Sequence, residues 1–301
     1  MNILSLDNVV KRYHNHTAVN HVSFDIPKGI VFGFLGPNGA GKSSLIRIIT
    51  SITAADEGRI LLDGEPISEM TSAQMGYMPE ERGLYKKMKV GDQLLYLAQL
   101  KGMSKSEAKE SIKKWFIKFG IEDWWNKKVE ELSKGMQQKI QFIATVVHNP
   151  KLLILDEPFS GLDPINTNLI KDEIAELNRN GTSIIFSTHR MEQVEKVCDR
   201  IVLINQGEVI LEGDVDHVKQ EYKDNIFRIE FDGNMPSDLQ SPHFTIVSDD
   251  DKSVTIQAKE GHNGNELLQS LISKGIEIIS YQEVLPSLNE IFIKKVGESN
   301  E

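Results

Sequence analysis

The chain has 301 residues, of which 40% are hydrophobic and 26% are charged, a balance typical of globular proteins with room for about two domains. No apolar run approaches the roughly 18 residues of a membrane-spanning helix, and the N-terminus does not resemble a signal peptide. The single cysteine, Cys198, excludes an internal disulfide, so a cytoplasmic setting is expected. The net charge is −10, and residues 222–301 carry 14 acidic and seven basic side chains, which argues against nucleic acid as a partner.

The first part of the chain combines predicted strands with a glycine-rich loop. Residues 3–10 and 18–26 are expected to form strands around a polar turn at residues 15–17. Residues 30–35 are apolar and β-prone, and an apolar helical stretch begins near residue 45. The loop between them reads Gly36-Pro37-Asn38-Gly39-Ala40-Gly41-Lys42-Ser43. This G-x-x-x-x-G-K-[ST] pattern predicts a site for nucleotide phosphates.

The residue types in this loop suit phosphate chemistry. Its glycines allow a tight backbone whose N–H groups point into one concavity, next to the positive end of the following helix. Lys42 can reach the β- and γ-phosphates, and the hydroxyl of Ser43 can ligate Mg²⁺. The loop alone leaves kinases, GTPases and many ATPases open.

Later segments predict an α/β domain with an inserted group of helices. Residues 58–64 read as a short strand, and residues 85–148 are mainly helical. Strand patterns return at 152–155, 183–187, 201–204 and 208–211, with a helix at 165–179. Alternation of strands and helices implies a mainly parallel sheet with helices on both faces. The inserted helical stretch is expected to be a subdomain.

From residue 222 onward the pattern changes. Strands are predicted at 226–231, 244–248, 252–257 and 276–281, with helices at 264–273 and 286–295. These elements predict a separate α+β domain over residues 222–301.

Two acidic residues close a predicted buried strand. Asp156, directly after residues 152–155, can hold Mg²⁺, and Glu157 is placed where a general base could activate the attacking water. His189 follows the strand at 183–187, where it can donate to the γ-phosphate and orient the water. Residues 132–138, Leu-Ser-Lys-Gly-Met-Gln-Gln, open another helix.

The order of these motifs resembles the ATP-binding-cassette (ABC) family over residues 1 to about 221. The matching parts are the phosphate loop, a signature segment at 132–138, the acidic strand, the loop at 160–163 and a switch histidine, His189. The resemblance implies a P-loop NTPase cassette with a mainly parallel sheet, an antiparallel β edge and a helical subdomain at about 81–136, followed here by the small α+β domain.

The same resemblance implies ATP and Mg²⁺ as cofactors and assigns roles to individual residues. The implied catalytic residues are Glu157, His189 and Lys42. The implied nucleotide contacts are Tyr13, Gly36, Pro37, Asn38, Gly39, Ala40, Gly41, Lys42, Ser43, Ser44, Glu80, Ser133 and Gly135. The implied Mg²⁺ ligands are Ser43, Asp156 and Glu80.

Three residues depart from the family pattern. Glu80 replaces the usual Gln at the junction with the helical subdomain, Lys134 replaces the first Gly of the signature, and Met136 replaces its Gln. The run at 80–85 and the C-terminal domain resemble one bacterial branch, the sodium-extrusion-type ATP-binding subunits of exporters. Sodium is therefore one expected cargo, beside other ions and small toxic compounds.

The family resemblance also implies partners. A signature helix covers the nucleotide held by a second cassette, so Ser133 and Gly135 are expected to act in trans across a homodimer or heterodimer. Transport requires a separate transmembrane permease subunit, which would place the chain at the inner face of the cell membrane. The expected permease contacts are Tyr85, Met88, Trp124 and Trp125, although both tryptophans could instead pack inside the subdomain.

Other functions fit the sequence less well. An ABC ATPase acting on the ribosome usually carries two cassettes, whereas this acidic chain carries one. A non-hydrolysing adaptor would not need the complete set of Lys42, Asp156, Glu157 and His189. A GTPase would need an Asn-Lys-x-Asp motif, which residues 126–129 lack. Metal binding by His14 and His16 has no neighbouring carboxylate cluster to support it.

Overall fold

A computed structural model describes residues 1–81, 83–232, 243–250, 252–259 and 261–298. The chain divides into two compact units, Met1–Asp214 and Val215–Glu301. The division precedes helix α8 (Val215–Glu221), whereas the sequence placed the domain boundary after residue 221. The reason is that the last strand of the first unit, β10, ends at Asp214.

The first unit is built on a six-stranded sheet with the strand order β10-β9-β3-β8-β7-β6. All neighbouring strands in it are parallel except β10, which pairs antiparallel with β9. Strands β3 and β8 are buried along their whole length, as expected where helices cover both faces. The strand bounds are β3 (Val31–Leu35), β6 (Met75–Met78), β7 (Leu152–Asp156), β8 (Ser183–Ser187), β9 (Arg200–Asn205) and β10 (Glu208–Asp214).

A second, antiparallel sheet has the strand order β2-β1-β4-β5. Its core is continuous with that of the parallel sheet. The ring of Phe24 on β2 stacks on Phe32 with a centroid distance of 5.8 Å and meets Phe34 edge-on at 5.5 Å. The strand bounds are β1 (Asn2–Tyr13), β2 (His16–Pro27), β4 (Glu57–Leu62) and β5 (Glu65–Pro66).

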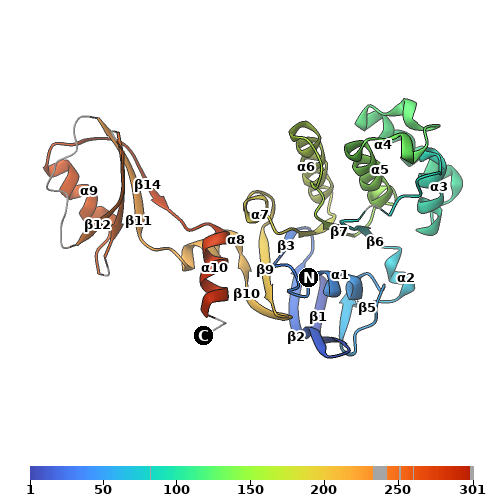
Figure 1. The fold of residues 1–301 in the computed structure, drawn as a ribbon, viewed down its shortest axis with the longest axis horizontal. Coiled ribbons are helices and arrows are strands. Elements are labelled where there is room, and N and C mark those ends of the chain that lie inside the picture. Colours follow the sequence, from blue (N-terminus) through green and yellow to red (C-terminus); the bar gives the residue numbers. More distant parts are fainter. Residues whose placement is uncertain (82, 233–242, 251, 260, 299–301) are drawn as a thin grey trace. The chain divides into compact units, whose positions relative to one another are not determined.

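Three helices form the predicted helical subdomain, and Figure 1 shows them gathered at one end of the first unit: α3 (Val90–Leu100), α4 (Lys105–Phe119) and α5 (Lys134–Val146). Helix α4 begins at a capping box formed by Ser104 and Glu107 and ends at Gly120, whose φ is 62°, so its sequence sets both ends. The other described α-helices of the unit are α1 (Lys42–Ile49), α2 (Glu69–Ser72), α6 (Pro164–Arg179) and α7 (Met191–Val197), and short 3-10 helices span Glu122–Trp124 and Val129–Glu131.

The second unit is an antiparallel sheet with helices, as the sequence predicted. The strand order is β12-β13-β11-β14, and α9 (Gly264–Ser273) packs on the sheet through Leu267 and Leu271. The strands are β11 (Ile226–Asp232), β12 (Phe244–Asp250), β13 (Ser253–Ala258) and β14 (Glu277–Val284). Helix α10 (Leu288–Glu298) is the last element.

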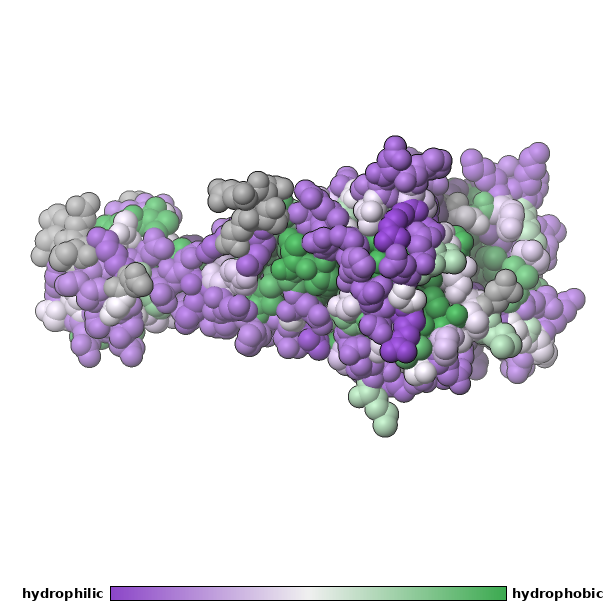
Figure 2. Space-filling model, turned by 90° about the horizontal axis from the view of Figure 1, so that it is seen from below, coloured by the Kyte–Doolittle hydropathy of each residue, from purple (hydrophilic) through white to green (hydrophobic). Residues whose placement is uncertain are grey.

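Among the described residues, none of the helices combines the length and apolarity that a membrane crossing requires. The face in Figure 2 is mainly hydrophilic, with hydrophobic residues gathered in smaller areas.

Candidate nucleotide-hydrolysis site

Four predicted site segments follow the carboxyl ends of parallel strands. Gly36 follows β3, Glu80 comes shortly after β6, Asp156 ends β7 and Ser187 ends β8. Strand β3 lies next to β8, and β7 lies between β8 and β6. Since open α/β sheets bind ligands at this edge, the topology brings the phosphate loop and the acidic residues together.

The phosphate loop is held between neighbouring strands. Gly36 has a φ of 146°, and an added Cβ would lie 2.2 Å from the carbonyl oxygen of Ile204 on β9. Gly41 has a φ of 108°, and its Cβ would lie 2.2 Å from the carbonyl oxygen of Ala18 on β2. Only glycine fits such positive φ values and close backbone contacts. The two glycines therefore fix where the loop lies relative to both sheets.

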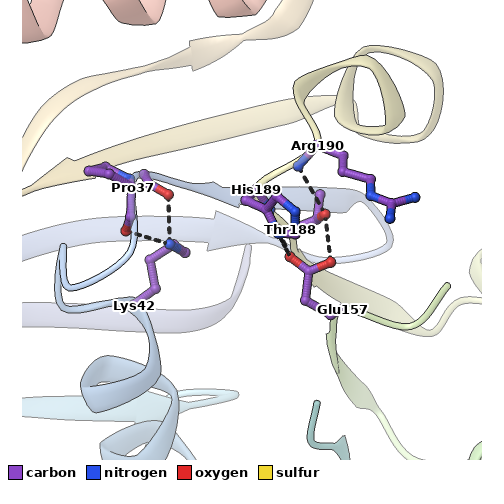
Figure 3. A network of polar contacts seen from close by, with 7 residues as sticks. Pro37, Lys42, Glu157, Thr188, His189 and Arg190 are labelled. Carbon is purple, nitrogen blue, oxygen red and sulfur yellow. Dashed lines mark hydrogen bonds and ion pairs between the residues drawn. The ribbon is translucent and has the colours of Figure 1, made fainter. Parts of the chain in front are cut away.

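Lys42 contacts the loop that precedes it. Its ammonium group donates hydrogen bonds to the carbonyl oxygens of Gly36 at 2.6 Å and Pro37 at 2.9 Å (Figure 3). Burial lowers the pKa of Lys42, while the negative charges of Asp156, Glu157 and Glu80 act in the opposite direction. The predicted phosphate-binding lysine and the three predicted acidic residues thus share one electrostatic environment.

Asp156 lies in a crowded acidic setting. Burial raises the pKa of its carboxyl group, and the charges of Glu157 and Glu80 raise it further, against a hydrogen bond from the Ser187 side chain and the charge of Lys42. Such a site favours a bound cation, because a cation relieves the repulsion between the carboxylates.

The donor set suits Mg²⁺ bound together with a nucleotide. Ser43 lies in the first turn of α1, beside Lys42. Within the described part of the chain, no group of three or more His, Cys, Asp or Glu residues is arranged to hold a metal. Mg²⁺ usually keeps several waters and binds through one or two carboxylates plus substrate phosphates, which is the kind of set that Ser43, Asp156 and Glu80 could complete.

Glu157 is held by the segment after β8. Its φ of 50° is uncommon for a residue other than glycine. Its Oε1 accepts a hydrogen bond from the backbone N–H of His189 at 2.8 Å and lies 2.7 Å from the Nδ1 atom of the same residue. Its Oε2 accepts a hydrogen bond from the hydroxyl of Thr188 at 3.0 Å. Figure 3 shows these contacts in one view with the phosphate-loop lysine.

His189 contacts the expected base in this structure. The sequence predicts that it donates to the γ-phosphate, and in this structure the Nδ1 atom of its ring lies 2.7 Å from Oε1 of Glu157. Its side chain is 60% exposed, whereas that of Glu157 is only 13% exposed. The histidine therefore has room to rotate toward a ligand.

Ser133 and Gly135 lie at the start of α5, in the helical subdomain. The Ser133 hydroxyl caps the helix by accepting a hydrogen bond from the backbone N–H of Met136 at 3.3 Å. An added Cβ at Gly135 would meet only the Cδ2 atom of Leu162, at an ordinary 3.8 Å. Lys134, between them, is exposed. The described residues of this chain therefore leave room at position 135.

The hydrogen bonds of two buried glutamines on α5 were not predicted from the sequence. The Nε2 atom of Gln138 donates to the carbonyl oxygen of Pro158 at 3.1 Å, next to Glu157. The Nε2 atom of Gln141 donates to the carbonyl oxygen of Pro79 at 2.8 Å, next to Glu80. In the sequence, the feature that could have indicated these contacts is a polar side chain on the apolar face of the helix, beside Ile140, Phe142 and Ile143. Helix α5 thus connects the signature segment to both acidic segments.

Tyr13 ends β1 and is 38% exposed, with the ammonium group of Lys11 5.5 Å from its ring centroid. Its partner in the strand pair is His16, the first residue of β2. Ala18, two positions further along β2, contacts the phosphate loop at Gly41. The hairpin end that carries Tyr13 therefore lies near the loop, with the ring accessible for stacking on a base.

The predicted permease contacts fall into two groups. Trp125 packs inside the subdomain, where its ring meets Phe116 edge-on at 5.7 Å and lies against Gly91. Trp124 is half-buried, with Lys127 over its ring at 5.7 Å. Tyr85 is 56% exposed. Arg82, in the 80–85 run, lies outside the described residues.

Comparison with known proteins agrees with this geometry. Residues 19–160 match the family model for ABC transporters. Residues 213–296 match the model for the C-terminal domain of DrrA1-3-like ATP-binding proteins.

Full-length relatives and a solved structure support the same assignment. YhaQ of Bacillus subtilis strain 168, an uncharacterised ABC transporter ATP-binding protein, is 44% identical over 98% of this chain and 99% of its own length. LnrL of the same organism, a linearmycin resistance ATP-binding protein, is 31% identical and covers 99% of each chain. A solved ATP-binding subunit of an ABC transporter aligns with a TM-score of 0.69 and 28% identity over 73% of this chain and 93% of its own.

The fold and site define a P-loop ATPase of the cassette type. The chain belongs to the ATP-binding proteins of ABC transporters, which act with membrane permeases, and it carries a DrrA1-3-like C-terminal domain.

Proposed function

We propose that this protein hydrolyses ATP to power an exporter from the cytoplasmic face of the membrane. The observation that carries the proposal is the meeting of Lys42 with Asp156 and Glu157 at one edge of the sheet. A regulator that binds ATP without cleaving it would not need this full set.

The proposed roles follow from these positions. The loop from Gly36 to Ser44, with Lys42, holds the β- and γ-phosphates. Ser43, Asp156 and Glu80 hold Mg²⁺, which when bound neutralises phosphate charge. Glu157 accepts a proton from the attacking water, and the ring of His189 rotates from Glu157 toward the γ-phosphate. The ring of Tyr13 stacks on the base.

We further propose that two cassettes close around the nucleotides, each completing the site of the other. The exposed Ser133 and the room around Gly135 support this arrangement, because a phosphate from a second subunit could approach the backbone there. Lys134 would add positive charge at the same point. The partner is a second copy of this chain or a different cassette.

The proposed docking surface for the permease centres on two tyrosines of the helical subdomain. The rings of Tyr85 and Tyr96 meet edge-on at 6.3 Å, and the side chains are 56% and 44% exposed. Met88 is half-buried nearby in sequence, and Lys86, Lys87 and Lys89 are exposed. Exposed aromatic residues are common in the centres of protein interfaces.

The proposed cargo is a small toxic compound. This rests on LnrL, a relative named for linearmycin resistance that aligns over 99% of this chain. Sodium rests only on resemblance to the sodium-extrusion-type branch, and it is the alternative cargo.

The test is to purify the chain with a candidate membrane permease and to measure Mg-ATP hydrolysis with and without that permease in lipid vesicles. We expect a stable complex with several-fold stimulated turnover, and Tyr85→Ala should reduce the stimulation while leaving the basal rate unchanged. Binding to ribosomes, with no membrane complex and no hydrolysis in vesicles, would instead support the ribosomal alternative.

A further inference from the structure

We propose that Thr188 is a positioning residue that holds one oxygen of Glu157 in place during hydrolysis. This inference rests on the proposed role of Glu157 as general base. The hydroxyl of Thr188 donates to Oε2 of Glu157 at 3.0 Å and accepts from the backbone N–H of Arg190 at 3.1 Å. Because the backbone N–H occupies the acceptor side of the hydroxyl, its proton is directed to the carboxylate. Figure 3 shows this chain of contacts, with the guanidinium of Arg190 pointing away.

The register of two parallel strands creates the contact. Asp156 pairs with Ser187 across β7 and β8, and the backbone N–H of Glu157 donates to the carbonyl oxygen of Ser187 at 2.9 Å. Glu157 and Thr188, the residues directly after these two strands, therefore also lie side by side. The side chain of Ser187 is hydrogen-bonded to Asp156, and that of Thr188 is hydrogen-bonded to Glu157. Consecutive hydroxyls thus hold consecutive carboxylates.

The two oxygens of Glu157 have different partners. Oε1 is held by His189, whose side chain is 60% exposed, and Oε2 is held by Thr188, which is only 1% exposed. When the His189 ring rotates to the γ-phosphate, its Nδ1 leaves Oε1, which then keeps only the hydrogen bond from the backbone N–H of His189. Thr188 has no such freedom, so Oε2 stays anchored.

This difference assigns the base function to one atom. As the water oxygen forms its bond to the γ-phosphorus and the bond to the ADP oxygen breaks, the water proton passes to Oε1. That proton later leaves with the phosphate product or to solvent. Oε2 keeps its hydrogen bond from Thr188 throughout. Without this bond the carboxylate would be held only at Oε1, by the backbone N–H of His189, and it would spend less time aimed at the water.

The test is the steady-state ATPase activity of the full chain with Thr188→Val, Thr188→Ser and Thr188→Ala. Valine keeps the volume and removes the hydroxyl, and the Ser/Ala pair separates hydroxyl from methyl if valine prevents folding. We expect Val and Ala to lower kcat by about 10- to 100-fold with KM within about threefold, and Ser to retain kcat within about threefold. Thr145→Val removes a similarly buried hydroxyl, which donates to the carbonyl oxygen of Gln141, and should leave kcat nearly unchanged.

A double-mutant comparison separates positioning from a general structural effect. In the Glu157→Gln background, adding Thr188→Val should change residual turnover by less than about twofold, because the carboxylate it serves is gone. Wild-type kcat in Thr188→Val, equal losses in Ser and Ala, or a full further loss in the double mutant would each overturn the inference. Glu157→Gln alone tests the base itself, so failure of the base and failure of the positioning role remain distinguishable.

Discussion

Two atoms of His189, its backbone nitrogen and Nδ1, lie 2.8 and 2.7 Å from a single carboxylate oxygen of Glu157. In this arrangement the expected base is engaged by the residue expected to contact the γ-phosphate. A ligand that attracts the histidine ring would therefore remove one of the two contacts to this oxygen, while the backbone N–H of His189 stays in place.

Replacement of Glu157 by Gln should stop turnover without preventing ATP binding. Loss of a general base lowers the rate by about 10²- to 10⁴-fold, while the phosphate loop remains intact. With Mg-ATP, the variant should accumulate as a closed dimer, which light scattering after size-exclusion chromatography would detect. Glu192→Gln, an exposed position on α7, is the matched control. Turnover at the wild-type rate in Glu157→Gln would remove Glu157 from the base role.

Replacement of Lys42 by Ala should reduce affinity for ATP itself, by at least about tenfold, because a charged contact to the phosphates is lost. The substitution also removes the hydrogen bonds to the carbonyl oxygens of Gly36 and Pro37. Equilibrium titration with a fluorescent ATP analogue measures the change. Lys109→Ala, at an exposed site on α4, should bind normally. Equal affinity in Lys42→Ala and the wild type would argue against phosphate contact by this lysine.

Asp156→Asn should stabilise the nucleotide-free protein at neutral pH while abolishing Mg-ATP hydrolysis. Burial raises the pKa of Asp156 in the folded state. The folded state therefore favours the protonated carboxyl. The contribution of this group to folding stability is fully present below the unfolded pKa of about 4, and it is lost as the pH rises through the raised pKa of the folded state. A neutral Asn avoids that loss.

Thermal unfolding between pH 4 and pH 8 measures this effect. We expect the variant to melt a few degrees above the wild type at pH 7 to 8, with the gain vanishing near pH 4. Asp172→Asn, an exposed carboxylate on α6, should show no such pattern. A variant less stable than the wild type at pH 8 would contradict the prediction.

Lys118→Met should destabilise the first unit more than Lys127→Met. The ammonium group of Lys118 on α4 lies 2.6 Å from a carboxylate oxygen of Glu173 on α6, whose side chain is only 6% exposed. Removal of the cation leaves a buried carboxylate without its partner, at a cost of about 1–3 kcal/mol. Lys127 pairs with the exposed Asp123 within the same segment, and its loss should cost less than about 1 kcal/mol.

Denaturant unfolding of the two variants at pH 7 makes the comparison. Burial raises the pKa of Glu173, so lowering the pH should protonate the abandoned carboxyl and shrink the Lys118→Met deficit. Equal destabilisation by both substitutions would show that the α4–α6 ion pair contributes no more than a surface pair.

The sequence predicts those structural features that depend on neighbouring residues along the chain. The loop from Gly36 to Ser43 and the apolar strand before Asp156 have distinctive patterns along the chain, and they lie where predicted. Strand β6, only four residues long, was not predicted as a strand, because Met75–Met78 has no periodicity to separate it from its surroundings. The hydrogen bonds of Thr188, Gln138 and Gln141 were also not predicted. Their partners come from other strands and loops, so only strand register and helix packing bring them together.

Helix α5 is capped by Ser133 and is tied through Gln138 and Gln141 to the carbonyl groups beside Glu157 and Glu80. If the ATP of a second cassette displaced the first turn of α5, the displacement would thus reach Glu157 and Glu80 of this chain. In a paired assembly, one molecule with a damaged signature would impair water attack on both sides. The smallest active unit would then be the dimer. Each cassette would hydrolyse ATP only when the other cassette has also bound ATP.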